Sequence, residues 1–163
     1  MRALHRPQQG FVYVAMLFAL AIFGLGLASI GQWTSERQRR DREAELLRTG
    51  QEVIAAIREF YIRSPGVAQR FPKTFSDLLE DTRFLGTVRH LRRAPLDPIT
   101  LSASWGFVRA PDGGFSGVYS LSDAAPLTQQ AIEVSGTRLA AAPRYSDWHF
   151  AYDPATDPNL PKH

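Results

Sequence analysis

The stretch RPQQGFVYVAMLFALAIFGLG, residues 6–26, decides how the rest of this chain can fold. A basic and polar opening ends at Gly10, and no residue from Phe11 to Ile30 carries a charge. Twenty helical residues rise about 30 Å, which matches the thickness of the hydrocarbon core of a membrane. The sequence therefore predicts a transmembrane helix segment at residues 11–30.

The composition leaves room for one folded domain beside this segment, because the chain has 163 residues and 44% of them are hydrophobic. The absence of cysteine excludes a disulfide framework and thiolate metal sites, and it leaves the compartment open. The net charge is +3, and two of the arginines lie in the first ten residues. The remainder is nearly neutral, so no nucleic-acid partner is expected.

Three fates are open for an apolar segment of this kind. A secretory signal would be removed, and Gly26-Leu27-Ala28 has the small-x-small pattern for cleavage near Ser29. An unprocessed single-span anchor would stay in place, as in a periplasmic adaptor or binding protein. In the third fate only the polar opening is removed, and the residues around Gly10 favour it.

Gln9-Gly10-Phe11, directly before an uncharged helix, resembles the cleavage site of the type IV pilin-like pseudopilin family. In that family a prepilin peptidase on the cytoplasmic face cuts after the glycine and methylates the new N-terminal phenylalanine. The resemblance implies a prepilin-type leader at residues 1–10, cleavage between Gly10 and Phe11, and N-methylation of Phe11. It also implies a single-pass protein of the bacterial inner membrane with its C-terminal domain in the periplasm.

Two features differ from the usual pattern. Most family members have a glutamate at the fifth mature position, where it meets the N-terminal amine of a neighbouring subunit, whereas this chain has Ala15. The resemblance therefore implies a minor or tip subunit. Four arginines at positions 37, 39, 40 and 42 outnumber those of the leader, and charge counting alone would place them in the cytoplasm. The cleavage-site resemblance requires the opposite orientation, which we adopt.

The helix is predicted to continue beyond the apolar segment. Residues 31–62 contain no proline, and Trp33 stands where an aromatic side chain would meet the membrane surface. A stripe of apolar or small residues then recurs with gaps of three and four, at Leu47, Gly50, Ile54, Ile57 and Tyr61, flanked by Leu46, Val53 and Phe60. This spacing predicts an amphipathic continuation of the helix with one buried face, ended by the Pro-Gly pair at 65–66.

Residues 63–152 are predicted to form a globular periplasmic domain. Thr74 and Asp77 have the spacing of a capping box at the start of a short helix. A second short helix is expected around residues 127–134. Proline and polar residues dominate residues 153–163, which are expected to form a flexible tail.

Strand signals in this domain predict a small antiparallel sheet. Strand-like residues at 105–109 and 115–121 flank the turn sequence PDGG, and this arrangement indicates a hairpin. The sequence RYSDWHFAY, residues 144–152, alternates aromatic and polar side chains and predicts a third, half-buried strand.

The order of these features resembles the globular part of type II secretion pseudopilins. The residues that carry the resemblance are Tyr61, Phe71-Pro72, Leu78-Leu79, Pro95-Leu96-Asp97-Pro98 and Trp105-Gly106. It implies an α+β, pilin-like fold in which a long N-terminal helix, half transmembrane and half amphipathic, packs on a small antiparallel sheet. The implied function is that of a structural pseudopilin subunit in protein transport, in a type II secretion system or a related type IV pilus-like assembly. Its implied partners are prepilin peptidase, other pseudopilins through helix packing, an inner-membrane assembly platform and the lipid bilayer.

No motif for catalysis is present, and we expect no enzyme activity and no catalytic residue. The sequence lacks a cysteine nucleophile, a Gly-x-Ser-x-Gly elbow, a P-loop and a dinucleotide-binding glycine pattern. The four histidines have no ligand spacing, and His149, which alternates with strand aromatics, is expected on an exposed face.

The acidic and basic residues of the domain are candidate ligands for calcium and for DNA. Asp123, Asp147, Asp153 and Asp157 could supply oxygen ligands, and major pseudopilins carry calcium in the loop after the hairpin. That loop offers only Ser122 and Asp123 here, so no cofactor is expected. The basic run at residues 89–93 has no interleaved aromatic residue, which favours a solvated or salt-bridging loop over DNA binding.

Overall fold

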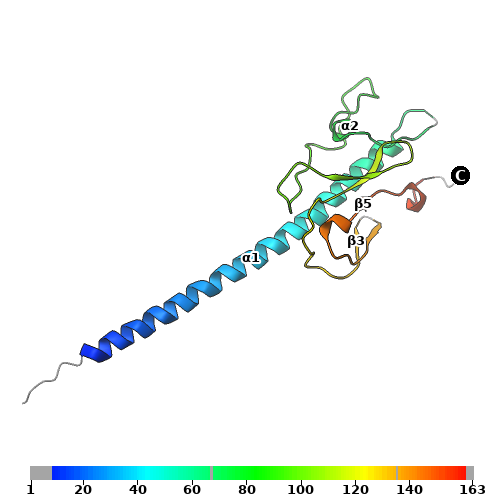
Figure 1. The fold of residues 1–163 in the computed structure, drawn as a ribbon. Coiled ribbons are helices and arrows are strands. Elements are labelled where there is room, and N and C mark those ends of the chain that lie inside the picture. Colours follow the sequence, from blue (N-terminus) through cyan, green and yellow to red (C-terminus); the bar gives the residue numbers. More distant parts are fainter. Residues whose placement is uncertain (1–8, 67, 135, 161–163) are drawn as a thin grey trace, which may run out of the picture. The chain divides into compact units, whose positions relative to one another are not determined.

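The computed structural model describes the backbone of residues 9–66, 68–134 and 136–160, and the side chains of these residues except 9–10 and 24–34. The chain separates into two compact units, Met1–Arg39 and Arg40–His163. The helix α1 (Gln9–Ile62) contributes residues to both units (Figure 1). Most of the expected leader, the expected secretory cleavage pattern and the side chain of Trp33 lie outside the described residues.

The described side chains of the first unit are exposed to solvent from Phe11 to Phe23. The large apolar ones, each at least half exposed, are Phe11, Val12, Tyr13, Val14, Met16, Leu17, Phe18, Leu20, Ile22 and Phe23. Over the part of the chain that the structure describes, none of the helices combines the length and apolar content that a membrane crossing requires. The segment expected to cross a membrane, residues 11–30, includes seven residues whose side chains lie outside the described part.

In the second unit, one face of α1 forms the base of the hydrophobic core. Its buried apolar or small residues include Leu46, Gly50, Val53, Ile54, Ala56, Ile57 and Phe60, and most of them recur at intervals of three and four. Leu47 and Tyr61, which the sequence pattern places near the centre of this face, are only half-buried. Leu46, Val53 and Phe60 are buried instead, so the buried face is centred one residue earlier than Leu47 and Tyr61.

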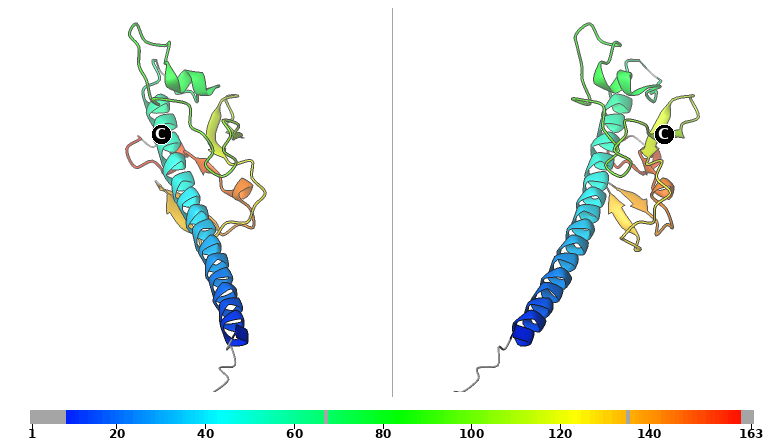
Figure 2. Two further views of the ribbon diagram at one scale, coloured as in Figure 1. Left: turned by 90° about the vertical axis from the view of Figure 1, so that its left-hand side faces the viewer. Right: turned by 60° about the vertical axis from the view of Figure 1, so that its left-hand side comes forward.

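A three-stranded antiparallel sheet covers this face of α1 (Figures 1 and 2). Its strands are β1 (Gly106–Arg109), β2 (Phe115–Tyr119) and β5 (Phe150–Ala151), in the order β1-β2-β5. A separate antiparallel pair consists of β3 (Ile132–Val134) and β4 (Thr137–Leu139). The expected α+β class with a small antiparallel sheet is therefore confirmed.

The expectation of a helix around residues 127–134 is wrong, because β3 and β4 form a hairpin there. Gly136 in its turn has a φ of +78°, a backbone conformation that glycine adopts without a steric penalty. The predicted third strand is also shorter than expected, since a 3₁₀ helix, η1 (Tyr145–Asp147), precedes β5. The alternation itself is preserved: Trp148, Phe150 and Tyr152 are buried.

The short helix α2 (Phe75–Leu79) lies beside the C-terminal end of α1 (Figure 2). The Asp77 carboxylate accepts the backbone N–H groups of Lys73 and Thr74 at 2.8 and 3.0 Å. This is the contribution of the acidic residue to the predicted capping box. Leu78 is fully buried and attaches α2 to the core.

Two glycines allow close packing in the core, Gly50 between α1 and the sheet and Gly117 between β2 and β5. A Cβ atom at Gly50 would overlap the ring of Phe150, and one at Gly117 would overlap the backbone of β5. The Phe150 side chain is fully buried in the core. Gly50 is therefore a packing position and not a weak point in the helix.

Replacing Gly50 with alanine is expected to destabilise the fold although alanine is the better helix former. Overpacking costs about 1–3 kcal/mol, whereas the gain in helix propensity is about 1 kcal/mol, so we expect a net loss of up to about 2 kcal/mol. Urea unfolding of the full-length chain in detergent micelles measures the change. Gln51→Ala, at an exposed helix position, is the matched control and should change little. An increase in stability of Gly50→Ala would contradict the packing account.

Candidate functional site

The residues expected to direct processing lie at the start of α1. Gly10 is already helical, the Phe11 side chain is 78% exposed, and Ala15 is exposed. At residue 15, the expected fifth position after cleavage, the side chain is a methyl group, which cannot pair with an amine. Phe11 and Ala15 therefore lie on an exposed part of the helix surface.

Among the described residues of the second unit, four carboxylates are buried. The sequence pattern pointed to Asp157 only as a possible calcium ligand and to Asp97 only as part of the Pro-Leu-Asp-Pro loop, and it predicted a buried structural role for none of the four. They are Glu43, Asp81, Asp97 and Asp157, each at most 6% exposed. A buried carboxylate is tolerated only when hydrogen bonds or an opposite charge replace its hydration. Each of these four has such partners, and together they attach the loops to α1 and to the sheet.

Glu43 joins α1 to the segment that precedes β3. Its carboxylate accepts the backbone N–H groups of Leu127 and Thr128 at 2.7 and 3.0 Å. The hydroxyl groups of Thr128 and Tyr145 donate to the same carboxylate. Burial alone would raise the pKa of Glu43, but these hydrogen bonds outweigh it and lower the pKa below its ordinary value. Glu43 is therefore ionised at neutral pH and binds four donors.

The position of Glu43 in the sequence could have predicted that it is buried. It lies three residues before Leu46 and seven before Gly50, on the row of α1 that faces the core. An acidic residue on a buried helix row needs partners, which distinguishes Glu43 from the exposed acids of the same helix.

Asp157 holds the C-terminal segment on α1. Arg58 Nε donates to Asp157 Oδ2 at 2.5 Å, and the Tyr152 hydroxyl donates at 2.9 Å. The Arg58 guanidinium and the N–H of Asn159 lower the pKa of Asp157 to about 2. Burial and the adjacent Asp157 carboxylate raise the pKa of Tyr152, so its hydroxyl remains a donor.

This contact corrects the expectation of a flexible tail at residues 153–163. Over residues 153–160 the chain forms a 3₁₀ helix, η2 (Pro154–Thr156), and Asp157 is 6% exposed. The composition predicted a flexible segment, but the ion pair between Arg58 and Asp157, which are 99 positions apart, holds it against α1. Residues 161–163 lie outside the described part.

Asp81 and Arg83 close the C-terminal end of α1. The Arg83 guanidinium donates to both Asp81 oxygens, at 2.8 and 2.6 Å, and to the carbonyl oxygen of Phe60 at 2.9 Å. It also lies 3.5 Å from the centroid of the Phe60 ring. Burial would raise the pKa of Asp81, but the hydrogen bonds from Arg83 and His90 lower it to about 2. The arginine thus satisfies a free helix carbonyl.

The hydrogen bonds around Asp81 place His90 in the interior, whereas the arginines of the basic run at residues 89–93 lie at the surface. The His90 side chain is fully buried, and its Nε2 lies 3.1 Å from Asp81 Oδ2. Arg89, Arg92 and Arg93 are exposed. His90 is therefore a structural residue, and the run does not form one continuous cationic surface. His149 is exposed, as predicted from the strand alternation.

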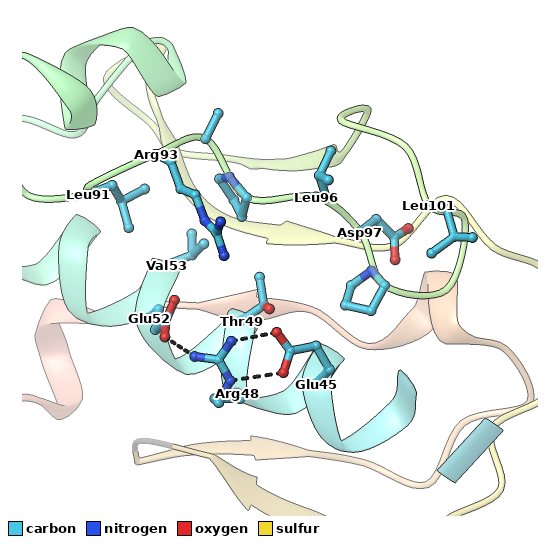
Figure 3. Close-up of a pocket in the computed structure, with 13 residues that line it drawn as sticks. Glu45, Arg48, Thr49, Glu52, Val53, Leu91, Arg93, Leu96, Asp97 and Leu101 are labelled. Carbon is cyan, nitrogen blue, oxygen red and sulfur yellow. Dashed lines mark hydrogen bonds and ion pairs between the residues drawn. The ribbon is translucent and has the colours of Figure 1, made fainter. Parts of the chain in front are cut away.

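A groove with a volume of about 330 Å³ lies between α1 and the loop at residues 91–101 (Figure 3). On the α1 side, Arg48 lies between Glu45 and Glu52 and forms ion pairs with both. Arg93 lies on the opposite wall (Figure 3). The charges on the α1 side are paired with one another, and Val53, Leu91, Leu96 and Leu101 add apolar surface to the groove.

Asp97, which also lines the groove, is committed to the loop that carries it. Its carboxylate accepts the N–H of Ile99 at 2.9 Å and the Thr100 hydroxyl at 2.9 Å. The buried hydroxyl of Ser120 donates to it at 2.7 Å. Asp97 therefore orders the Pro-Leu-Asp-Pro loop against the end of β2.

The residues considered for calcium do not form one set of ligands: Asp123 and Asp147 both lie beside Arg144, and Asp157 pairs with Arg58. Asp123 has a side chain that is 82% exposed and lies 3.7 Å from Nη1 of Arg144. The hydroxyl of Ser122 accepts the N–H of Ala124. Asp147 pairs with Arg144, whereas Asp153 caps its own turn. Within the described residues, no group of three or more histidine, aspartate or glutamate side chains is placed to hold a metal ion.

Glu43→Gln tests the attachment of α1 to the segment before β3. The amide keeps the size of the side chain but replaces one acceptor oxygen with a donor that faces other donors. We expect a loss of about 1–3 kcal/mol in the free energy of unfolding. Glu45→Gln, an exposed site two residues away, should lose less than about 1 kcal/mol. Equal stability of the two variants would contradict the assigned role of Glu43.

Asp157→Asn tests the ion pair with Arg58 through its pH dependence. The native pKa of Asp157 lies below that of an unfolded aspartate, so the ionised group stabilises the fold above about pH 4. This contribution disappears as the pH falls toward 2. The variant should be less stable by about 1–2 kcal/mol at pH 7, and the difference from the natural chain should vanish near pH 2. Urea unfolding across pH measures it, with exposed Glu133→Gln as the control. A difference that persists unchanged to pH 2 would contradict the ion-pair account.

Comparison with known proteins identified no similar protein. No protein-family model, no curated protein and no solved structure matches the chain. The α+β fold and the buried carboxylate contacts are therefore read from this chain alone.

Proposed function

We propose that the chain is a minor structural pseudopilin of a type II secretion system or a related type IV pilus-like assembly, and that it contributes to protein export. In this proposal it is processed by prepilin peptidase and then works by assembly with other subunits. No catalytic step is required of it.

The observation that carries the proposal is the exposed apolar surface at the start of α1, directly after Gln9-Gly10-Phe11. Large apolar side chains from Phe11 to Phe23 are at least half exposed. Burial of one such side chain is worth about 1.5–3 kcal/mol, so together they favour transfer out of water strongly. A lipid bilayer or the apolar helices of other subunits can accept this surface. The same helix surface would serve both states.

The second half of α1 supports the proposal in a different way. From Glu43 onward the helix is part of a folded domain with a core, whereas residues 35–42 are exposed. A simple membrane anchor needs no such continuation. One helix that is apolar at its start and packed in a small antiparallel sheet domain at its end suits a pilin-like subunit.

Ala15 indicates where in the filament the subunit would be placed. A neighbouring subunit whose N-terminal amine approached this position would find no carboxylate. The contact that subunits of a filament shaft make at the fifth mature residue is therefore missing on this side. We assign the subunit a minor or tip position, in which fewer neighbours are needed.

The proposal places the chain in the bacterial inner membrane, with residues 40–160 in the periplasm. The leader faces the cytoplasm, where prepilin peptidase acts. The assembly platform of the inner membrane and the helices of other pseudopilins are the further partners.

The mature N-terminus tests the proposal. Co-expression of the full-length chain with a prepilin peptidase should yield a protein that begins with N-methylated Phe11, and mass spectrometry of the purified protein measures this. Gly10→Val should block the cleavage because the peptidase requires the small residue. Gly26→Val, at another glycine of the apolar stretch, is the matched control and should be processed normally.

The other outcomes identify the competing functions. A chain that retains Met1 under these conditions would overturn the pseudopilin proposal and favour an unprocessed periplasmic adaptor. A mature protein that starts near Ser29 would show secretory cleavage instead.

A further inference from the structure

The groove between α1 and the loop at residues 91–101 has two exposed leucines among the residues that line it. Leu96 and Leu101 are 62% and 67% exposed. Every residue that lines the groove belongs to the second unit. Its volume of about 330 Å³ is at the lower end of the range for binding clefts. Large apolar side chains exposed beside a cleft are typical of a surface that binds another molecule.

Leu101 has a strained backbone conformation. Its φ of +56° lies in the left-handed region, which is unfavourable for a bulky residue. The loop imposes this conformation, because the Leu101 N–H donates to the carbonyl oxygen of Asp97 at 2.8 Å and the Asp97 carboxylate binds the rest of the turn. Asparagine would adopt it more readily, and the exposed leucine adds little to the core. A strained residue of this kind is a candidate contact for a partner.

The charges of the groove favour an acidic partner. Glu45 and Glu52 both pair with Arg48, and the aspartate of the Pro-Leu-Asp-Pro loop binds its own loop. Arg93 extends from the loop toward α1 (Figure 3). Arg93 and its neighbour Arg92 are exposed, and among the described side chains neither has a carboxylate oxygen within 4.0 Å. The groove can therefore accept an acidic side chain from outside the chain.

The loop after β2 has the complementary features. Leu121 and Leu127 are 50% and 39% exposed, and between them in the sequence lies Asp123, whose side chain is 82% exposed. Asp123 shares Arg144 with Asp147, which leaves one negative charge in excess. The domain therefore carries an acidic loop with exposed leucines and, on a different surface, a leucine-lined groove with unpaired arginines.

This loop does not occupy the groove of its own chain. The N–H of Leu127 donates to Glu43, and the carbonyl oxygens of Ser122 and Ala124 accept N–H groups from η1. These hydrogen bonds fix the loop backbone, and neither of its leucines lines the groove. In this fold the two surfaces can meet only between different copies of the chain.

We propose that the loop at residues 121–127 of one copy docks in the groove of a second copy. Its leucines then contact Leu96 and Leu101, and Asp123 pairs with Arg93. The inference goes beyond the proposed function, which assigns no interface to the domain. Because the loop and the groove are different surfaces, the contact is heterologous, and each pair of copies leaves one groove and one loop unoccupied for further copies.

Disulfide crosslinking tests the contact, since the natural chain has no cysteine. Full-length Ala94→Cys, which lines the groove, and full-length Ala124→Cys, in the loop, are mixed in detergent micelles and oxidised. The mixed disulfide should form several-fold faster than in the matched control, in which exposed Ser76→Cys replaces Ala94→Cys. A rate equal to that of the control would overturn the contact. So would either variant alone, if it dimerised as fast as the mixture.

A charge exchange tests the ion pair. Arg93→Asp in the chain that supplies the groove should slow crosslinking several-fold, and Asp123→Arg in the chain that supplies the loop should do the same. When both changes are present, opposite charges face each other again and the rate should recover. Raised salt should slow the natural pair. A rate that stays low when both charges are exchanged would contradict the pairing of Arg93 with Asp123.

Leu101→Asn separates docking from a role in the fold. Asparagine tolerates the left-handed conformation, so urea unfolding should show no loss of stability. Crosslinking should nevertheless slow several-fold because the apolar contact is lost. The control Leu85→Asn, at an exposed leucine outside the groove, should change neither measurement. An unchanged crosslinking rate in Leu101→Asn would overturn docking through this leucine.

These experiments use the unprocessed chain in detergent, so they require neither cleavage nor a membrane. A chain that is cleaved before Phe11 but whose copies do not crosslink overturns only this contact. Crosslinked copies of a chain that retains Met1 when prepilin peptidase is present overturn only the pseudopilin function.

Discussion

The buried carboxylate of Glu43 is the constraint on which the arrangement of this chain depends. Four donors from the segment before β3 and from η1 converge on one side chain of α1. An ionised group in the core is costly without partners, so the domain cannot release these donors cheaply. Glu43 therefore marks the residue from which α1 belongs to the domain. The described side chains before it, at residues 11–23 and 35–42, are exposed.

The same principle recurs along the domain. With no cysteine to crosslink its loops, the chain uses buried aspartates as attachment points. Asp157 fixes the C-terminal segment to Arg58, and Asp81 with Arg83 closes the end of α1. Gly50 then allows β5 to approach the helix. The short strands alone would hold such a small sheet weakly, and the polar contacts supply the connections between its loops and α1.

The sequence predicted the elements that local pattern controls. The α1 stripe, the capping box at Asp77, the first hairpin and the aromatic alternation near Phe150 all follow from spacing. The predictions that were wrong concern segments whose structure depends on distant partners. Residues 153–160 looked unstructured because the effect of Arg58 on Asp157 cannot be seen in composition. The β3–β4 hairpin was missed because its short strands carry a weak period. The motif at Gly10 and Phe11 consists of neighbouring residues, so the sequence alone was enough to predict cleavage there. The proteins that would act on this motif are separate chains, so the structure of this chain does not test the prediction.

The central claim is that α1 has an apolar half held in lipid and a second half held by the domain in water. Because the chain has no cysteine, single cysteines can be placed along α1 and tested in native membranes with a water-soluble maleimide. The account predicts no labelling at Val14, Phe18 and Ile22, full labelling at Gln51 and Ala55, and labelling of all five after denaturation. Equal labelling of the five positions in intact membranes would contradict it.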